Sequence, residues 1–382
     1  MDKFISVMST VGSVLLAILI LLVMITVHEF GHYVAGKALK FKINEFAIGF
    51  GPKLFKRTSK RTGEVFSVRL LPLGGFCAFD GEDKEDDGPD AFNKKAPWKR
   101  IIVLIAGPLM NYLLALLLII IAMFSFGQMM FKVGAVAPPP ESGTAVEQYI
   151  EYSFEEGDVI LKIEGKNIYL TTDAMSALAG KKAGEIVNIR VLRDGSEKDI
   201  KIILRRDCDF SSSMETSKLW HALGVGTYGV VSGENEEGEP TYTYYFDLDV
   251  QSCRFGFFRT IGHSIQYSWR IAGTIFKVLG ELLTGHLGLS AMGGPVTTIK
   301  MTSEIATQSA QSFFEIAAYI GVNLAVFNLL PIPALDGSKV IFCLIEWIFR
   351  RPVPRKIEAV IHAVGFVAIL GFAVLVDILQ FV

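Results

Sequence analysis

The part of the sequence that decides the fold reads Val23-Met24-Ile25-Thr26-Val27-His28-Glu29-Phe30-Gly31-His32. It places an H-E-x-x-H motif at the end of an apolar run that begins near Val11. On a helix, His28 and His32 lie four residues apart on one face, where two imidazoles can bind one Zn²⁺. Glu29 beside them can accept a proton from a metal-bound water. Ionisable groups are costly at membrane depth, and a metal site accounts for three of them within five residues.

The composition is that of a membrane protein. Of the 382 residues, 51% are hydrophobic, which is too apolar for an ordinary soluble enzyme. The net charge is -2 and no basic stripe dominates, which argues against nucleic acid as a general partner. Four scattered cysteines without a C-x-x-C pair indicate neither a disulfide framework nor a thiolate metal site. They are Cys77, Cys208, Cys253 and Cys343.

Four segments are apolar enough to cross a bilayer, which takes about 20 residues. They cover residues 11–34, 101–126, 313–335 and 357–381. The first could be mistaken for a signal peptide, but it has no A-x-A-like cleavage site and leads into the motif, so we expect a retained span.

The distribution of basic residues predicts the orientation of these spans. Lysines and arginines gather in residues 37–100 and 350–356, whereas few follow the second span or flank the termini. The positive-inside rule therefore places both basic loops in the cytoplasm, with both termini and the large middle segment outside.

The loop after the first span is expected to contain structure of its own. Residues 42–48 and 64–70 have strand character, and the apolar L-P-L-G-G-F stretch at 71–76 predicts backbone that dips to the membrane surface. The acidic run at 81–90 is interpreted as a solvated linker, with a divalent-cation site as the alternative.

The middle segment predicts a soluble domain followed by a surface helix. Residues 157–168 indicate two short strands, and the turn at Asp194-Gly195 indicates a hairpin. The order of elements over residues 133–250 resembles a PDZ domain of the bacterial protease type, with residues 211–246 as an extension. Residues 255–283 form an amphipathic pattern that fits a membrane-surface helix.

A catalytic zinc site needs a third protein ligand. The first and third spans run in the same direction, so Asp336 at the inner end of the third lies at the depth of His28 and His32. Pro331 and Pro333 interrupt the helix just before it, which requires a cavity or close partners. A helix-terminal cap is the alternative role of Asp336.

The other candidate ligands fit less well. His362 is a lone histidine in the fourth span, and Asp377 lies at the opposite face of the membrane. His221, His263 and His286 fall outside the spans.

Three motifs in register carry a family resemblance. They are HEFGH at 28–32, AGPLMN at 106–111 and NLLPIPALDG at 328–337, with A-F-N-K-K-A-P-W-K-R at 91–100 after the acidic run. On these motifs nearly the whole chain resembles the site-2 proteases, which are intramembrane zinc metalloproteases, in the PDZ-bearing bacterial branch of the regulator of sigma-E protease. The resemblance implies a polytopic α-helical membrane protein with four transmembrane helices, a membrane-associated β-hairpin region and an extracytoplasmic PDZ-like α+β domain.

The resemblance also implies an activity, namely zinc-dependent endopeptidase cleavage in regulated intramembrane proteolysis. His28, His32 and Asp336 would bind one Zn²⁺, and Glu29 would be the general base. The implied substrate-binding residues are Asn328, Gly74, Gly75, Phe76, Pro331 and Pro333. Substrates would be single-span membrane proteins already cut on their outer side, such as anti-sigma factors or signal-peptide remnants.

The expected location is the bacterial inner membrane, with the active site near the cytoplasmic side. The spans and loops divide the chain into eight parts. These are the first span at 1–36, the cytoplasmic loop at 37–100, the second span at 101–127, the PDZ-like domain at 128–250, the surface helices at 251–310, the third span at 311–337, a cytoplasmic loop at 338–356 and the fourth span at 357–382.

One departure and two alternatives accompany this interpretation. Residues 138–156 lack the family's usual pattern before Gly157-Asp158, which puts peptide binding by the outer domain in doubt. A silent membrane scaffold with a structural zinc would not need Glu29. A metal-ion transporter would need polar residues along several spans, whereas the second and fourth spans are almost wholly apolar.

Overall fold

The computed structural model describes most of the chain. The described residues are 2–82, 88, 91–134, 154–210, 216–224, 228–234, 240–245, 248–286 and 293–381. They form two compact units, the first made of Met1–Ala122 and Gly288–Val382 and the second of Met123–Leu287.

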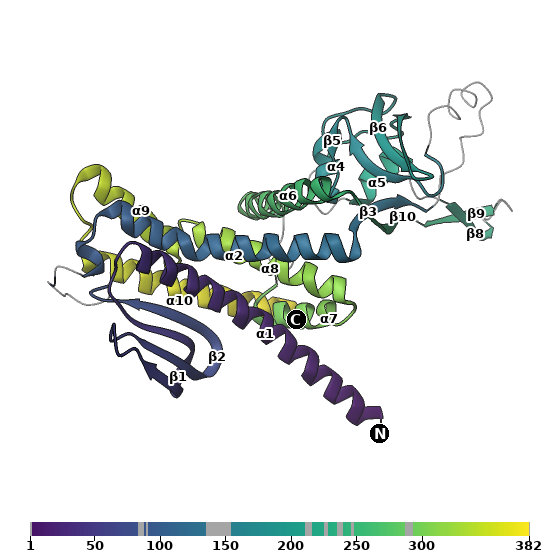
Figure 1. Ribbon diagram of the computed structural model, residues 1–382. Helices are drawn as coiled ribbons and strands as arrows, with labels where there is room; N and C mark the ends of the chain where they lie inside the picture. The colour runs from purple at the N-terminus through teal and green to yellow at the C-terminus, as the bar shows by residue number, and fades with distance from the viewer. Residues whose placement is uncertain are drawn as a thin grey trace. The chain divides into compact units, whose positions relative to one another are not determined.

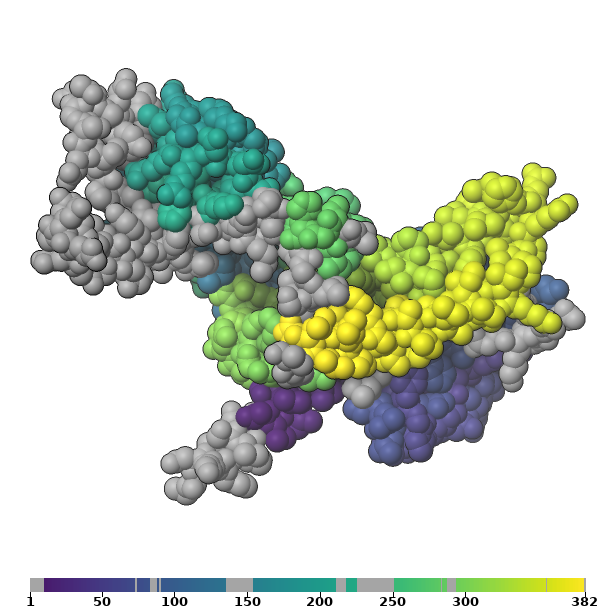
Figure 2. Space-filling view, turned by 180° about the vertical axis from the view of Figure 1, so that it is seen from behind, coloured from purple at the N-terminus to yellow at the C-terminus, as the bar shows by residue number. Residues whose placement is uncertain are grey.

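Four helices are long and apolar enough to cross a membrane within the described ranges, as the sequence predicted. They are α1 (Asp2–Ala38), α2 (Pro97–Phe126), α8 (Ala310–Leu329) and α10 (Arg355–Phe381), labelled in Figure 1. Of these, α10 is the least covered by protein, since only 6% of its most apolar 18-residue segment is buried. Figure 2 shows it lying along the surface of the first unit. Its exposed side chains are apolar, which suits contact with lipid.

A curled antiparallel sheet follows α1. Its strands are β1 (Ile43–Thr58) and β2 (Val65–Phe79). Both strands bend back, so that Phe46 pairs with Cys77 on one side and with Phe66 on the other. The last part of β2 is therefore one edge of the sheet, and residues 53–58 form the other. The L-P-L-G-G-F stretch, expected as a separate dipping segment, is part of β2.

Aromatic and charged contacts attach the sheet to the end of α1. The Tyr33 ring meets the edges of Phe46 and Phe66, with ring centroids 5.6 and 5.8 Å apart. Glu64, which is 7% exposed, forms an ion pair with Lys37 and accepts a hydrogen bond from the Tyr33 hydroxyl. An almost fully buried carboxylate with a charged partner fixes the hairpin to α1.

Two further helices belong to the first unit, and both differ from the expected division. Helix α9 (Asp336–Phe349) occupies most of the segment expected as a loop at 338–356. Helix α7 (Pro295–Ala306) packs between α1, α8 and α10, whereas the sequence grouped it with the preceding surface helix. Its first turn is fixed by Asp377 on α10, which accepts hydrogen bonds from the backbone N–H groups of Val296 and Thr297 at 3.0 and 3.1 Å. A carboxylate is well placed there because the first N–H groups of a helix have no partner within it.

The second unit is built around an antiparallel sheet in the order β10-β3-β4-β6-β7, with β5 beside β4. Its elements are β3 (Gln128–Val133), β4 (Val159–Ile163), β5 (Lys166–Asn167), α4 (Thr171–Leu178), β6 (Ile186–Arg193), β7 (Ser196–Ile203), α5 (Thr216–Leu223), a hairpin of β8 (Tyr228–Glu234) and β9 (Pro240–Tyr245), and β10 (Leu248–Cys253). The hairpin expected at Asp194-Gly195 is confirmed, because Arg193 pairs with Ser196 across two residues of positive φ. Residues 138–153 lie outside the described part.

Helix α6 (Phe257–Leu283) closes the second unit and is strongly two-sided. Its polar side contacts the sheet domain, where Gln266 accepts hydrogen bonds from Asn167 and Tyr169, each at 2.8 Å. On the neighbouring face of the helix, Phe258 and Trp269 are 86% and 70% exposed. Large exposed aromatic side chains on a helix whose polar side is occupied fit the expected position on a membrane surface.

Candidate active site

Three side chains from distant parts of the sequence converge in the first unit. The Nε2 atoms of His28 and His32 lie 3.1 Å apart, and Oδ2 of Asp336 lies 3.0 Å from the first and 3.4 Å from the second. Ligand atoms about 2 Å from a tetrahedral zinc are about 3.3 Å from one another. The three atoms therefore fit one zinc ion, and this group could hold a metal.

The hydrogen bond of His32 fixes which nitrogen is free. Its Nδ1 lies 2.8 Å from the carbonyl oxygen of Val103 on α2. A carbonyl can only accept, so Nδ1 carries the proton and Nε2 presents its lone pair to the site. An outer partner of this kind orients the ring of a zinc-bound histidine. This contact was not predictable from the sequence, because it joins residues 71 positions apart.

Asp336 reaches the site because the chain turns sharply between α8 and α9. A Cβ on Gly337 would lie 2.2 Å from the carbonyl oxygen of Leu330, so only glycine allows α9 to start this close to the end of α8. Ala334 has a φ of 76°, a left-handed conformation that a side chain disfavours. Asp336 is thus the first residue of α9 and also faces both imidazoles.

Two glycines let α1 and α2 approach closely at the site. A Cβ on Gly31 would lie 2.3 Å from the carbonyl oxygen of Ala106, and a Cβ on Gly107 would lie 2.4 Å from Nε2 of His32. From the sequence, Gly107 was only one residue of the A-G-P-L-M-N motif, and the structure shows that it makes room for the imidazole of His32.

Replacing Gly107 with alanine should therefore weaken zinc binding. The added methyl group would displace the ring of His32, and we expect affinity to fall by about 10- to 100-fold, as for other losses of support around a metal. Competition with a chelating dye would measure this. Gly371→Ala on α10 is the matched control, because a Cβ there meets nothing within 4 Å. Equal affinity in both variants would contradict the prediction.

Glu29 lies beside the edge of β2. A Cβ on Gly75 would be 3.3 Å from Cγ of Glu29 and 3.7 Å from Cγ2 of Ile25, so the strand runs directly against α1 here. The end of β2 is an edge of its sheet, so its backbone groups on this side lie next to the proposed base. Glycine at position 75 keeps the approach open.

The other residues expected to bind substrate lie on β2, at the end of α8 and in the connection to α9. Gly74 and Phe76 flank Gly75 on β2, where the Phe76 ring stacks on that of Phe50 with centroids 6.4 Å apart. Asn328 is in the last turn of α8 and is half-buried, and Pro331 and Pro333 lie in the connection to Asp336.

The candidates that the sequence analysis set aside have other partners. His362 accepts a hydrogen bond from the backbone of Ala334, and Asp377 binds the start of α7. Among the residues that the structure describes, His28, His32 and Asp336 are the one group of three whose ligand atoms lie within 4.8 Å of one another.

Comparison with known proteins agrees with this geometry. The profile of peptidase family M50 matches residues 16–372. A Clostridium perfringens protein named "Putative zinc metalloprotease CPE1693" is 35% identical over 369 residues, which cover 96% of this chain and 97% of the relative. Similarly named relatives from Fusobacterium nucleatum and Clostridium acetobutylicum are 28% and 30% identical, over 95% of this chain and 97% and 94% of their own lengths.

Proposed function

The chain belongs to peptidase family M50, the site-2 protease family, and from this premise we propose that it cuts single-span membrane proteins within or beside the membrane. It is a zinc metalloprotease with apolar helices of membrane-spanning length. The observation that carries the proposal is the convergence of His28, His32 and Asp336, two of them on α1, a helix long and apolar enough to span the membrane.

The residues at the site suggest a division of roles. When bound by His28, His32 and Asp336, zinc supplies a Lewis acid that makes water a better nucleophile and polarises a carbonyl. Glu29 accepts the proton of the attacking water and delivers it to the leaving amine.

The edge of β2 suggests how a substrate is presented. A helical segment hides its carbonyl groups in its own hydrogen bonds, so it must unwind before a water can attack. An extended peptide can add to an exposed sheet edge through backbone hydrogen bonds. Addition next to Gly75 would bring a peptide bond beside Glu29, which supports roles for Gly74, Gly75 and Phe76 in substrate binding. Asn328, Pro331 and Pro333 would border the same substrate near Asp336.

The second unit suggests a limit on substrate size. Its sheet and helices are consistent with a PDZ-like domain on the outer side of the bacterial inner membrane, with α6 on the membrane surface. Substrates would then be proteins already shortened outside, such as anti-sigma factors or signal-peptide remnants. Such a filter works by exclusion and needs no peptide pocket.

A panel of tagged reporters would test the proposal. Each would carry the same apolar segment, with either a short outer tail or a folded outer domain, and would be co-expressed with the native chain or with the Glu29→Gln variant. We expect a cut in or beside the apolar segment, located by mass spectrometry, for the short tail and the native chain alone. Cleavage confined to soluble parts of the reporters would contradict the proposal.

A further inference from the structure

The connection between α8 and α9, residues 330–335, leads directly to Asp336 and contacts α10. The backbone N–H of Ala334 donates a hydrogen bond to Nδ1 of His362 at 3.0 Å. One turn further along α10, a Cβ on Gly365 would lie 2.2 Å from the Cβ of Pro333. Residues 362 and 365 lie on the same face of a helix, so α10 contacts two consecutive residues of the connection.

The connection needs such support because its own conformation is strained. Ala334 has a φ of 76°, which a residue with a side chain adopts only when its surroundings enforce it. The neighbouring backbone is tied locally, with Ile332 N–H bonded to Leu330 O at 2.7 Å and Leu335 N–H bonded to Ile332 O at 3.1 Å. The N–H of Ala334 instead bonds to a side chain 28 residues later in the chain.

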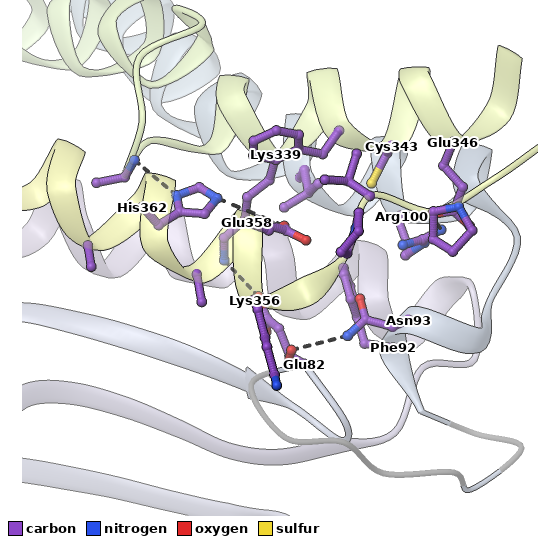
Figure 3. Close-up of a pocket in the computed structure, with 18 of the residues that line it drawn as sticks. Glu82, Phe92, Asn93, Arg100, Lys339, Cys343, Glu346, Lys356, Glu358 and His362 are labelled. Atoms are coloured by element: carbon purple, nitrogen blue, oxygen red, sulfur yellow. Dashed lines mark hydrogen bonds and ion pairs between the residues drawn. The ribbon is translucent and has the colours of Figure 1, made fainter. Parts of the chain in front are cut away.

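The surroundings of His362 fix its orientation. Nδ1 accepts a hydrogen bond, so in the neutral ring the proton is on Nε2. That atom faces Glu358, 3.9 Å from the nearer oxygen, and the ring meets the edge of Phe342 with centroids 5.7 Å apart. Figure 3 shows His362 in the wall of a cavity of about 1090 Å³, with its two nitrogens directed to opposite sides. The imidazole is therefore set between the connection and the cavity.

We propose that His362 is a positioning residue for the metal site. It holds Ala334 in its strained conformation and thereby places Asp336, two residues later, against His28 and His32. This rests on the proposed role of Asp336 as a zinc ligand. A metal site depends on ligand positions to within a fraction of an ångström, so loss of the contact should lower zinc affinity. His362 itself takes no part in the chemistry.

Two substitutions separate positioning from general packing. His362→Leu removes the acceptor and keeps an apolar side chain, whereas His362→Gln keeps an acceptor oxygen that can reach the same N–H. We expect the leucine variant to bind zinc about 10- to 100-fold more weakly and the glutamine variant to stay close to the native chain. Gly365→Ala is a second test, because its methyl group would push on Pro333 and displace the same backbone while His362 itself is kept. Zinc affinity should fall in this variant as well.

Zinc affinity would be measured by chelator competition on the purified full-length chain, together with thermal unfolding and with kcat and KM of the zinc-saturated enzyme. Val364→Ala, at an exposed position of α10, is the control. Native affinity in His362→Leu would overturn the inference while leaving the proposed function intact. An equal loss in the leucine and glutamine variants, matched by an equal fall in melting temperature, would also overturn it. Absence of zinc binding by the native chain would instead contradict the proposed function.

Discussion

Cleavage is expected to fall by about 10²- to 10⁴-fold in the Glu29→Gln variant while zinc stays bound, because general-base catalysis contributes about that much. Glutamine has the size of glutamate and keeps a side-chain oxygen that accepts hydrogen bonds, but it cannot take a proton from water. Glu29 is not one of the three converging side chains, so the metal site should survive. Initial rates on a short-tailed reporter and zinc content of the purified protein would measure both effects.

The matched control for this variant is Glu315→Gln. Glu315 also lies on a candidate span, α8, where its carboxylate accepts a hydrogen bond from Gln311 at 2.9 Å. The Glu315→Gln variant should retain both bound zinc and cleavage activity. Undiminished cleavage by Glu29→Gln would contradict the proposed base, and a biological role that survives in this variant would favour a scaffold. Loss of zinc in Glu29→Gln would mean that the residue acts on the metal rather than on water.

The sequence could predict the three candidate ligands because local rules define them. Two histidines four residues apart share a helix face, and the depth of a span places Asp336 opposite them. Both arguments depend only on helix geometry and on the direction of the spans. The structure brings the three side chains together as expected. The apolar spans were predictable for the same reason, since their length and composition alone identify them.

The support of the site was not predictable, because it comes from tertiary contacts. Val103 offers a backbone carbonyl, which any residue type could supply. His362 was interpreted as a lone structural histidine, since nothing local shows that it meets Ala334. The bend that lets Phe46 pair with two parts of β2 was not predictable either. The alternation of polar and apolar residues shows that strands form, but not which residues pair across them.

Element boundaries were less predictable where composition gave mixed signals. The stretch with Gly74 and Gly75 was expected to dip to the membrane surface, and the structure places it in strand β2, where Gly75 passes close to α1. Residues 338–356 were expected as the cytoplasmic connection between the third and fourth spans, and the structure shows that helix α9 occupies most of this segment. Residues 251–310 were grouped by amphipathic character, which does not show that α6 and α7 belong to different units.

Removing the third ligand should have the largest effect on the metal. We expect Asp336→Ala to lose zinc and, with it, cleavage. Its zinc affinity should fall by more than about 100-fold, which is the upper end of the loss when a residue that only supports a ligand is replaced. The reason is that two imidazoles alone leave half of a tetrahedral shell to water. Chelator competition and metal analysis of the purified chain would measure this, with Asp377→Asn as the control. Asp377 is also an aspartate on a candidate membrane span, α10. Its carboxylate binds the backbone at the start of α7 and not the two histidines.

A second variant distinguishes a ligand from a helix cap. Asp336 begins α9, so its removal could also destabilise the start of that helix. Asp336→Asn keeps a side-chain oxygen and a good helix-start residue, but the neutral amide is a much weaker partner for zinc. If Asp336 is a ligand, the asparagine variant should lose zinc nearly as fully as the alanine variant while its melting temperature without metal stays close to native. If Asp336 only caps α9, the asparagine variant should bind zinc as the native chain does, and the three-residue site argued above would be wrong.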